Sequence, residues 1–99
     1  MKLFVDDMRK PFDDNFTIAR NYTQATILID LMDFDFISLD FDLGEKRNGL
    51  DLIQYIRDNK KYPKHINIHS THPTGSQLMY KLATDIFPKN VKITRNTKR

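Results

Sequence analysis

The chain has 99 residues, with 16 Lys/Arg against 13 Asp/Glu and a formal charge of +3. This length suits a single domain with its own core, and the absence of cysteine excludes disulfides, zinc–thiolate sites and thiol catalysis. No apolar run approaches the roughly 18–20 residues of a membrane span, and the chain does not open with a signal-peptide pattern. We therefore expect a cytoplasmic domain over residues 1–95, followed by a basic tail over residues 96–99, with no membrane partner.

Charge is unevenly distributed between the two halves of the chain. Residues 1–56 contain six Lys/Arg and eleven Asp/Glu, a charge of −5, whereas residues 57–99 contain ten Lys/Arg and two Asp/Glu, a charge of +8. An acidic half beside a basic half is compatible with a carboxylate site next to a surface that attracts phosphates. It is also compatible with solvated helix faces and a basic tail, and the charge pattern alone favours this second interpretation.

Short apolar runs predict five strands, and amphipathic segments predict three helices. The strands are expected over residues 1–5, 16–20, 36–39, 65–69 and 91–94, and the helices over residues 23–32, 50–59 and 73–87. Strands that alternate with helices predict an α/β layered sheet, mostly parallel, with right-handed crossovers. Only the loop at residues 8–15 separates the first two strands. We therefore expect either a degenerate connection there or a second strand at the sheet edge.

Aspartates follow two of the predicted strands. Asp6 and Asp7 end the first strand, and Asp40 ends the third, with Asp42 close behind. Ligands of an open parallel sheet bind at the carboxyl ends of its strands, so these side chains are expected to converge. A divalent cation would relieve the repulsion between them, and oxygen ligands favour Mg²⁺, with Mn²⁺ as an alternative. We predict that all four aspartates bind this metal, although any one of them taken singly is better explained as a turn or cap residue.

Two histidines lie at the end of the fourth predicted strand. His69 and His72 bracket Ser70 and Thr71 and are expected to face the acidic cluster. A histidine in that position is suited to proton transfer or to donating hydrogen bonds to a phosphate. The alternative is a packed histidine with no catalytic role.

Three residues are candidates for binding a phosphate. Arg9 directly follows the acidic pair and, like Arg20, is suited to bidentate contact with a phosphate. Both arginines could instead only neutralise excess carboxylate. Gly75 lies at the predicted start of a helix, where backbone N–H groups favour anions, although glycine is also ordinary in a turn.

The aspartates and their flanking residues resemble a response-regulator receiver domain. The matching residues are Val5-Asp6-Asp7 after the first strand, Leu39-Asp40 at the end of the third, and Asn48-Gly49 before the next helix. In receivers an acidic pair binds Mg²⁺, the third-strand aspartate accepts a phosphoryl group, and a Ser or Thr after the fourth strand contacts it. The resemblance implies these roles for Asp6 and Asp7, for Asp40 and for Ser70.

Three features differ from an ordinary receiver. The first helix is missing, the lysine at the end of the fifth strand has no clear counterpart in Lys92 or Arg95, and His69 precedes the hydroxyl residue. These differences resemble a smaller relative, the cyclic-phosphate processing receiver-like family. The residues that match its pattern are Asp6-Asp7-Met8-Arg9-Lys10-Pro11, Arg20, Ser38-Leu39-Asp40-Phe41-Asp42-Leu43-Gly44, Gly49, His69-Ser70, Gly75 and Met79. Two positions depart from the pattern, because Phe41 replaces a histidine and His72 replaces an asparagine.

This second resemblance implies a metal-dependent phosphoesterase that processes cyclic phosphates on nucleotides or RNA ends. It implies catalytic roles for Asp40, His69, Ser70 and His72, and leaves open whether Asp40 is a nucleophile or only a metal ligand. Two other functions stay possible on the sequence. One is a phospho-accepting signalling module, and the other is a non-catalytic binding or adaptor domain with a protein partner.

Overall fold

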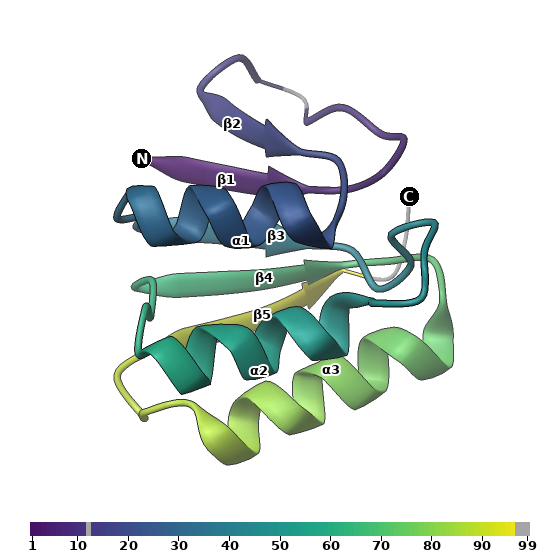
Figure 1. Cartoon of the computed structure of the whole chain (residues 1–99). Coiled ribbons are helices and arrows are strands. Elements are labelled where there is room, and N and C mark those ends of the chain that lie inside the picture. The colour runs from purple at the N-terminus through teal and green to yellow at the C-terminus, as the bar shows by residue number, and fades with distance from the viewer. Residues whose placement is uncertain (12, 97–99) are drawn as a thin grey trace.

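A five-stranded sheet and three helices make up the part of the chain that the computed structural model describes, residues 1–11 and 13–96 (Figure 1). The strands are β1 (Lys2–Val5), β2 (Phe16–Ala19), β3 (Phe36–Leu39), β4 (His65–His69) and β5 (Lys92–Asn96). The helices are α1 (Tyr22–Leu31), α2 (Gly49–Asn59) and α3 (Pro73–Ile86). Within the same residues, none of the helices combines the length and the apolar character needed to cross a membrane.

The strand order is β2-β1-β3-β4-β5, and every neighbouring pair is parallel. This confirms the predicted receiver-like (flavodoxin-like) α/β sheet. Strand β2 lies at one edge, and the described residues between β1 and β2 form no helix, so the expected loss of the first helix is confirmed as well. Asn96 ends β5, and the rest of the basic tail expected over residues 96–99 lies outside the described residues.

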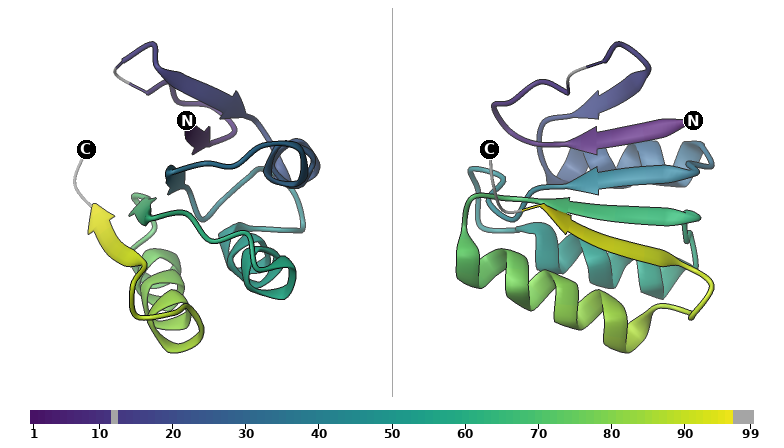
Figure 2. Two further views of the ribbon diagram at one scale, coloured as in Figure 1. Left: turned by 90° about the vertical axis from the view of Figure 1, so that its left-hand side faces the viewer. Right: turned by 180° about the vertical axis from the view of Figure 1, so that it is seen from behind.

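All three helices cover the same face of the sheet (Figure 2). The chain passes from β2 over β1 to β3, then to β4 and to β5, so each helical crossover moves across the sheet in one direction. Because parallel crossovers are right-handed, crossovers in one direction place their helices on one side. The β1–β2 connection runs the opposite way and would cover the other face, but its described residues contain no helix.

We call the other side of the sheet the helix-free face. Side chains alternate between the two faces of a strand, which assigns residues to it at every second position. Its residues are Lys2 and Phe4 of β1, Phe16 and Ile18 of β2, Phe36 and Ser38 of β3, His65, Asn67 and His69 of β4, and Lys92, Thr94 and Asn96 of β5.

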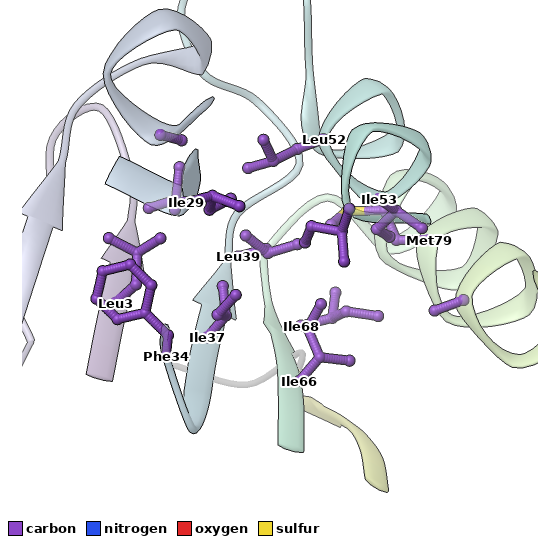
Figure 3. Packing of buried hydrophobic residues seen from close by; sticks show 14 of the residues in the cluster. Leu3, Ile29, Phe34, Ile37, Leu39, Leu52, Ile53, Ile66, Ile68 and Met79 are labelled. Atoms are coloured by element: carbon purple, nitrogen blue, oxygen red, sulfur yellow. The ribbon is translucent and has the colours of Figure 1, made fainter. Parts of the chain in front are cut away.

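The hydrophobic core fills the space between the sheet and the helices (Figure 3). The strand residues that alternate with the helix-free face are at most 1% exposed in the central strands: Leu3, Val5, Ile37, Leu39, Ile66 and Ile68. The helices pack Ile29, Leu52, Ile53 and Met79 against them. Each such side chain contributes roughly 1.5–3 kcal/mol by leaving water. The main hydrophobic cluster therefore lies between the helices and one face of the sheet.

Local capping fixes the start of α2 next to Asp40. The Asn48 side chain accepts a hydrogen bond from the N–H of Leu50, and the Asp51 carboxylate accepts one from the N–H of Asn48. Gly49 permits a close approach, because a Cβ there would lie 2.5 Å from the carbonyl oxygen of Asp40 and from Cε of Met79. Any larger residue at position 49 would push α2 away from the strand end that carries Asp40.

The one-sided core predicts a difference between two isoleucines of the sheet. Ile68→Ala should lower the free energy of unfolding by roughly 2–5 kcal/mol, because it opens a cavity under the helices. Ile18→Ala should lower it by less than about 1 kcal/mol, because Ile18 on the helix-free face is 39% exposed. Urea denaturation of both variants measures the difference, and equal losses would contradict the one-sided core.

Candidate metal and phosphate site

Asp6, Asp40 and His69 meet at the carboxyl ends of the three central strands. One ligand atom from each side chain lies within 4.8 Å of the others, and the three residues are 1%, 7% and 4% exposed. The strand ladder extends one residue beyond β1 and β3, since the N–H of Asp6 donates to the Ala19 carbonyl and that of Asp40 to the Val5 carbonyl. The backbone thus fixes where both carboxylates begin, and the structure brings together three of the predicted site residues.

Asp6 is held as a carboxylate by the groups around it. One carboxylate oxygen accepts the N–H groups of Met8 (2.9 Å) and Arg9 (2.8 Å), and the other lies 3.0 Å from Nε2 of His69. Burial alone would raise the pKa of Asp6, but the hydrogen bonds from His69 and the two backbone N–H groups outweigh it. The pKa of Asp6 therefore lies well below its usual range, and the residue stays ionised.

In contrast to Asp6, the Asp40 carboxyl group has a raised pKa. Burial and the negative charge of Asp6 raise the pKa of Asp40 above its ordinary value. His69, the N–H of Phe41 and the Ser70 hydroxyl act in the opposite direction without cancelling the effect. Two buried carboxylates this close need either a proton or a cation between them, and a cation can satisfy both at once.

A chain of hydrogen bonds on the helix-free face orients the ring of His69. Thr94 Oγ1 donates to Asn67 Oδ1 (2.7 Å), Asn67 Nδ2 donates to Ser38 Oγ (3.3 Å), and Ser38 Oγ lies 2.6 Å from His69 Nδ1. At the far end, His65 Nε2 lies 2.7 Å from Thr94 Oγ1. Since ionised Asp6 accepts from His69 Nε2, that nitrogen carries a hydrogen, and Nδ1 either accepts from or donates to the Ser38 hydroxyl. His69 therefore faces Asp6 as a donor and not as a metal ligand.

Ser38, Asn67 and Thr94 belong to this hydrogen-bond chain and have no predicted role in the sequence. The sequence does contain a signal for Asn67. In the run His65-Ile66-Asn67-Ile68-His69 the polar residues recur at every second position, so Asn67 and His69 must lie on the same face of β4. The roles of Ser38 and Thr94 can be recognised only once the strand order and register are known. In that register Ser38 pairs with Asn67, and Asn67 pairs with Thr94.

The two predicted arginines have different surroundings. Arg20 donates from Nη1 to the carbonyl oxygens of Asp6 (3.0 Å) and Arg9 (2.5 Å), so it braces the loop after β1. Arg9 donates from Nη2 to Thr71 Oγ1 (3.2 Å), and its buried Nη1 has no hydrogen-bond partner among the described residues. A buried unpaired guanidinium nitrogen is costly, and an anionic ligand would satisfy it. The geometry thus favours Arg9 over Arg20 as the anion-binding residue.

Asp7 and Asp42, which the sequence predicts as metal ligands, do not join the buried group. The Asp7 carboxylate lies against Gly44, whose added Cβ would sit 2.8 Å from Asp7 Oδ2. Asp42 is exposed and accepts the N–H of Gly44 at 2.9 Å, which is the turn role that a single aspartate commonly has. In this structure both carboxylates are turned toward the loop after β3.

Ser70, His72 and Gly75 lie around the start of α3. Ser70 is buried beside Asp40, and its hydroxyl accepts the N–H of His72. His72 is exposed and caps α3, because its Nδ1 accepts the N–H of Gly75 at 2.8 Å. That bond occupies the N–H expected to bind an anion, and a Cβ on Gly75 would lie 2.4 Å from the ring of Phe41. Here Gly75 is a packing residue.

The donor set fits a hard divalent cation. Asp6 and Asp40 offer carboxylate oxygen atoms as ligands, and the chain has no cysteine. His69 is not a ligand here, because its Nε2 hydrogen is donated to Asp6. Mg²⁺ binds through one or two carboxylates and completes its octahedron with water and substrate oxygens. The two carboxylates would hold such an ion, and the raised pKa of Asp40 would fall when it binds.

Asp40→Asn should stabilise the metal-free protein. The amide keeps the shape of the side chain but is not repelled by Asp6, so we expect a gain on the order of 1 kcal/mol at neutral pH, or roughly 4–8 °C in Tm. Because the pKa of Asp40 is raised on folding, this gain should vanish below the ordinary value of 3.8 and grow as the pH rises through the folded pKa.

Thermal unfolding at several pH values with EDTA measures this effect. Asp85→Asn is the control, because it removes an exposed carboxylate of α3 that pairs only with Lys81 among the described residues. An Asp40→Asn variant less stable than the parent at neutral pH would show that Asp40 carries no repulsive charge.

Comparison with known proteins identifies the fold and the family of this chain. The chain is similar to a solved structure described as a response regulator protein from Burkholderia pseudomallei with a phosphorylated aspartic acid, calcium ion and citrate. The two are 19% identical with a TM-score of 0.65, over 99% of this chain and 60% of that one, so the likeness is one of fold. No curated protein gave a significant match. The family model for the cyclic-phosphate processing receiver domain matches residues 1–85, so the chain belongs to that family.

Proposed function

We propose that this domain is a metal-dependent phosphoesterase that acts on cyclic phosphates of nucleotides or RNA ends, in the cytoplasm. The observation that supports this proposal most directly is a cation site next to an anion site. The buried carboxylates of Asp6 and Asp40 need a positive ion, and the buried Nη1 of Arg9 needs a negative group. A phosphate ester bound to Mg²⁺ supplies both at the same place.

In this proposal the acidic residues bind the cation and the arginines bind the phosphate or hold the loop. Asp6 and Asp40 hold the ion, which would polarise the phosphoryl oxygens and lower the pKa of a bound water. Arg9 binds a phosphate oxygen through Nη1 and is positioned by Thr71 and by the backbone bond from its own N–H to Asp6. Arg20 keeps the loop in place through its bonds to backbone carbonyls. The Ser70 hydroxyl lies beside Asp40, where it can donate to a phosphate oxygen or to that carboxylate.

Hydrolysis of a cyclic phosphate then requires one proton at the leaving oxygen. The oxygen of water forms a bond to phosphorus, one ester bond of the ring breaks, and the released sugar oxygen takes up a proton. In this proposal His69 is the proton donor in its doubly protonated form, in which Nε2 donates toward the site and Nδ1 donates to Ser38 Oγ. After it gives up the Nε2 proton to the leaving oxygen, His69 takes up a proton from the attacking water. Exposed His72 has its Nδ1 committed to capping α3, which favours His69 for this role.

A second candidate function is phosphoryl transfer to Asp40 by a partner protein. Asp40 follows β3 and lies at the carboxyl end of the sheet, and the similar response regulator is described as carrying a phosphorylated aspartic acid and a calcium ion. The buried ring of His69 and the bond network behind it fit this reaction less well, because phosphoryl transfer to a carboxylate needs no proton donor at that place.

Cyclic phosphodiesterase activity is the direct test. Nucleoside 2′,3′-cyclic phosphates and RNA ending in a cyclic phosphate should be hydrolysed with Mg²⁺ or Mn²⁺ and not with EDTA. Asp40→Asn should abolish turnover, and His69→Ala should lower kcat by at least about hundredfold because the proton donor is lost. Arg9→Ala should mainly raise KM, by about tenfold or more, because a charge-assisted bond to the phosphate is removed.

The control is again Asp85→Asn, which should keep full activity. Turnover that survives EDTA or Asp40→Asn would refute the metal-dependent reaction. Stable labelling of Asp40 by acetyl phosphate, together with no hydrolysis of any cyclic phosphate, would instead support the phosphoryl-accepting function.

A further inference from the structure

The helix-free face carries a groove of about 390 Å³. The central strands supply Phe4, Phe36, Ser38, His65 and Asn67 to its floor, and the edge strand supplies Phe16. Pro11 and Asp13 of the β1–β2 connection line it as well, and that connection lies on the side of the sheet away from the helices (Figure 2). A groove of this size falls within the range of small-ligand sites.

Aromatic rings form a continuous row along this groove. The ring of Phe16 contacts Phe4 and Phe36 edge to face, at centroid distances of 5.9 and 5.8 Å, and Phe36 contacts His65 at 4.8 Å. Phe4 in turn stacks flat on His69, with centroids 4.5 Å apart and planes 5° apart. A row of fixed rings on a sheet is a surface on which a planar base can stack.

The polar groups of the groove suit an uncharged ligand. Lys2 and Asp13 face each other at 4.0 Å and offset each other's charge, while Lys2 Nζ also lies 5.2 Å from the Phe16 ring centroid. Asn67 is held in place by bonds to Ser38 and Thr94, and its amide nitrogen has a second hydrogen. The groove therefore offers stacking surfaces and a fixed amide, with no excess of charge.

The groove continues into the phosphate site. A second cavity of about 60 Å³ shares Phe4, Pro11, Ser38, Asn67 and Asn96 with it. The same cavity is also lined by Arg9, Lys10 and His69. A neutral aromatic groove thus opens directly onto a cationic end beside His69, which matches the two ends of a nucleotide.

We infer that the groove binds the terminal nucleoside of the ligand whose phosphate lies between Arg9 and the Asp6–Asp40 pair, an inference that rests on the proposed function. The base stacks on the rings of Phe16 and Phe36, and its ribose lies toward Asn67 and Phe4. The cyclic phosphate extends past His69 toward Arg9. The preferred substrate is then a nucleoside cyclic phosphate or an RNA 3′ end, which the domain binds more tightly than a cyclic phosphate without a base.

The described residues between β1 and β2 form no helix, and this leaves the groove open. A helix between β1 and β2 would cover the helix-free face, since that crossover runs opposite to the other three. It would lie over Phe4 and Ser38 and close the groove. Such a helix would also cover the hydrogen-bond chain that runs from His65 to Asp6. The polar side chains that β3 and β4 contribute to this chain would then be unusual, because the strands of a sheet covered on both faces are apolar. This favours a polar, planar ligand over a helix or a second copy of the chain.

Titration of the ¹⁵N-labelled protein with uridine and adenosine tests the groove without the phosphate. Amide shifts should appear at residues 2–4, 36–38 and 65–67, and should be absent in Phe16→Leu/Phe36→Leu, which keeps the apolar bulk and removes the rings. The control is Tyr62→Leu, which changes a half-buried ring that packs on Phe87 on the helix-covered side. Nucleosides that cause no shifts at the groove overturn the inference.

Turnover separates this inference from the proposed function. The groove variant should raise KM for a nucleoside 2′,3′-cyclic phosphate by about tenfold, the loss expected when a base stack is removed. It should leave KM for glycerol 1,2-cyclic phosphate, which has no base, unchanged. Equal effects on both substrates, or none, overturn the nucleoside site while the phosphoesterase stands. Absence of turnover with both substrates overturns the phosphoesterase instead. Sedimentation that shows a dimer lost only in the groove variant assigns the face to a second copy and also overturns the inference.

Discussion

The repulsion between two buried carboxylates organises the functional end of this domain. Asp6 and Asp40 lie at the ends of adjacent strands, where the sheet ladder leaves them no freedom to separate. Two backbone N–H groups and His69 keep Asp6 ionised. Burial and the negative charge of Asp6 therefore raise the pKa of Asp40. Such an arrangement is unfavourable by itself and becomes favourable when a cation is bound. The fold therefore places two buried carboxylates where a bound cation would relieve their repulsion.

The topology of the sheet connects this site to the surface beside it. Because three right-handed crossovers run in one direction, the three helices of the described residues and the main hydrophobic cluster lie on one face. The opposite face is free to hold polar side chains, and the chain from His65 through Asn67 and Ser38 to His69 uses it. In a sheet covered on both faces these positions would be apolar. Because the described residues between β1 and β2 form no helix, this face can hold both the hydrogen-bond chain and the aromatic groove.

Sequence reasoning found the centre of the candidate site and missed part of its surroundings. Asp6, Asp40 and His69 could be placed together because parallel strands bring their carboxyl ends to one edge of a sheet. Asp42 was assigned by the same rule, and Gly75 was assigned from its place at a helix start, yet local bonds decide how both are used: Asp42 accepts the N–H of Gly44, and the N–H of Gly75 donates to His72. Such short-range competition within a loop does not follow from residue type and spacing.

The sequence by itself determined the parallel α/β sheet, the absence of the first helix and the residues at the strand ends. Strand-length apolar runs, the short segment between the first two strands, and the aspartates after two of the runs are all local features of the chain. Only the tertiary structure decided that Arg9 has an unpaired buried nitrogen while Arg20 braces a loop, and that Ser38, Asn67 and Thr94 join in one chain. These features depend on strand register and on the direction of each side chain. They join residues far apart in sequence, and the pattern along one strand does not encode which residue of another strand lies beside it.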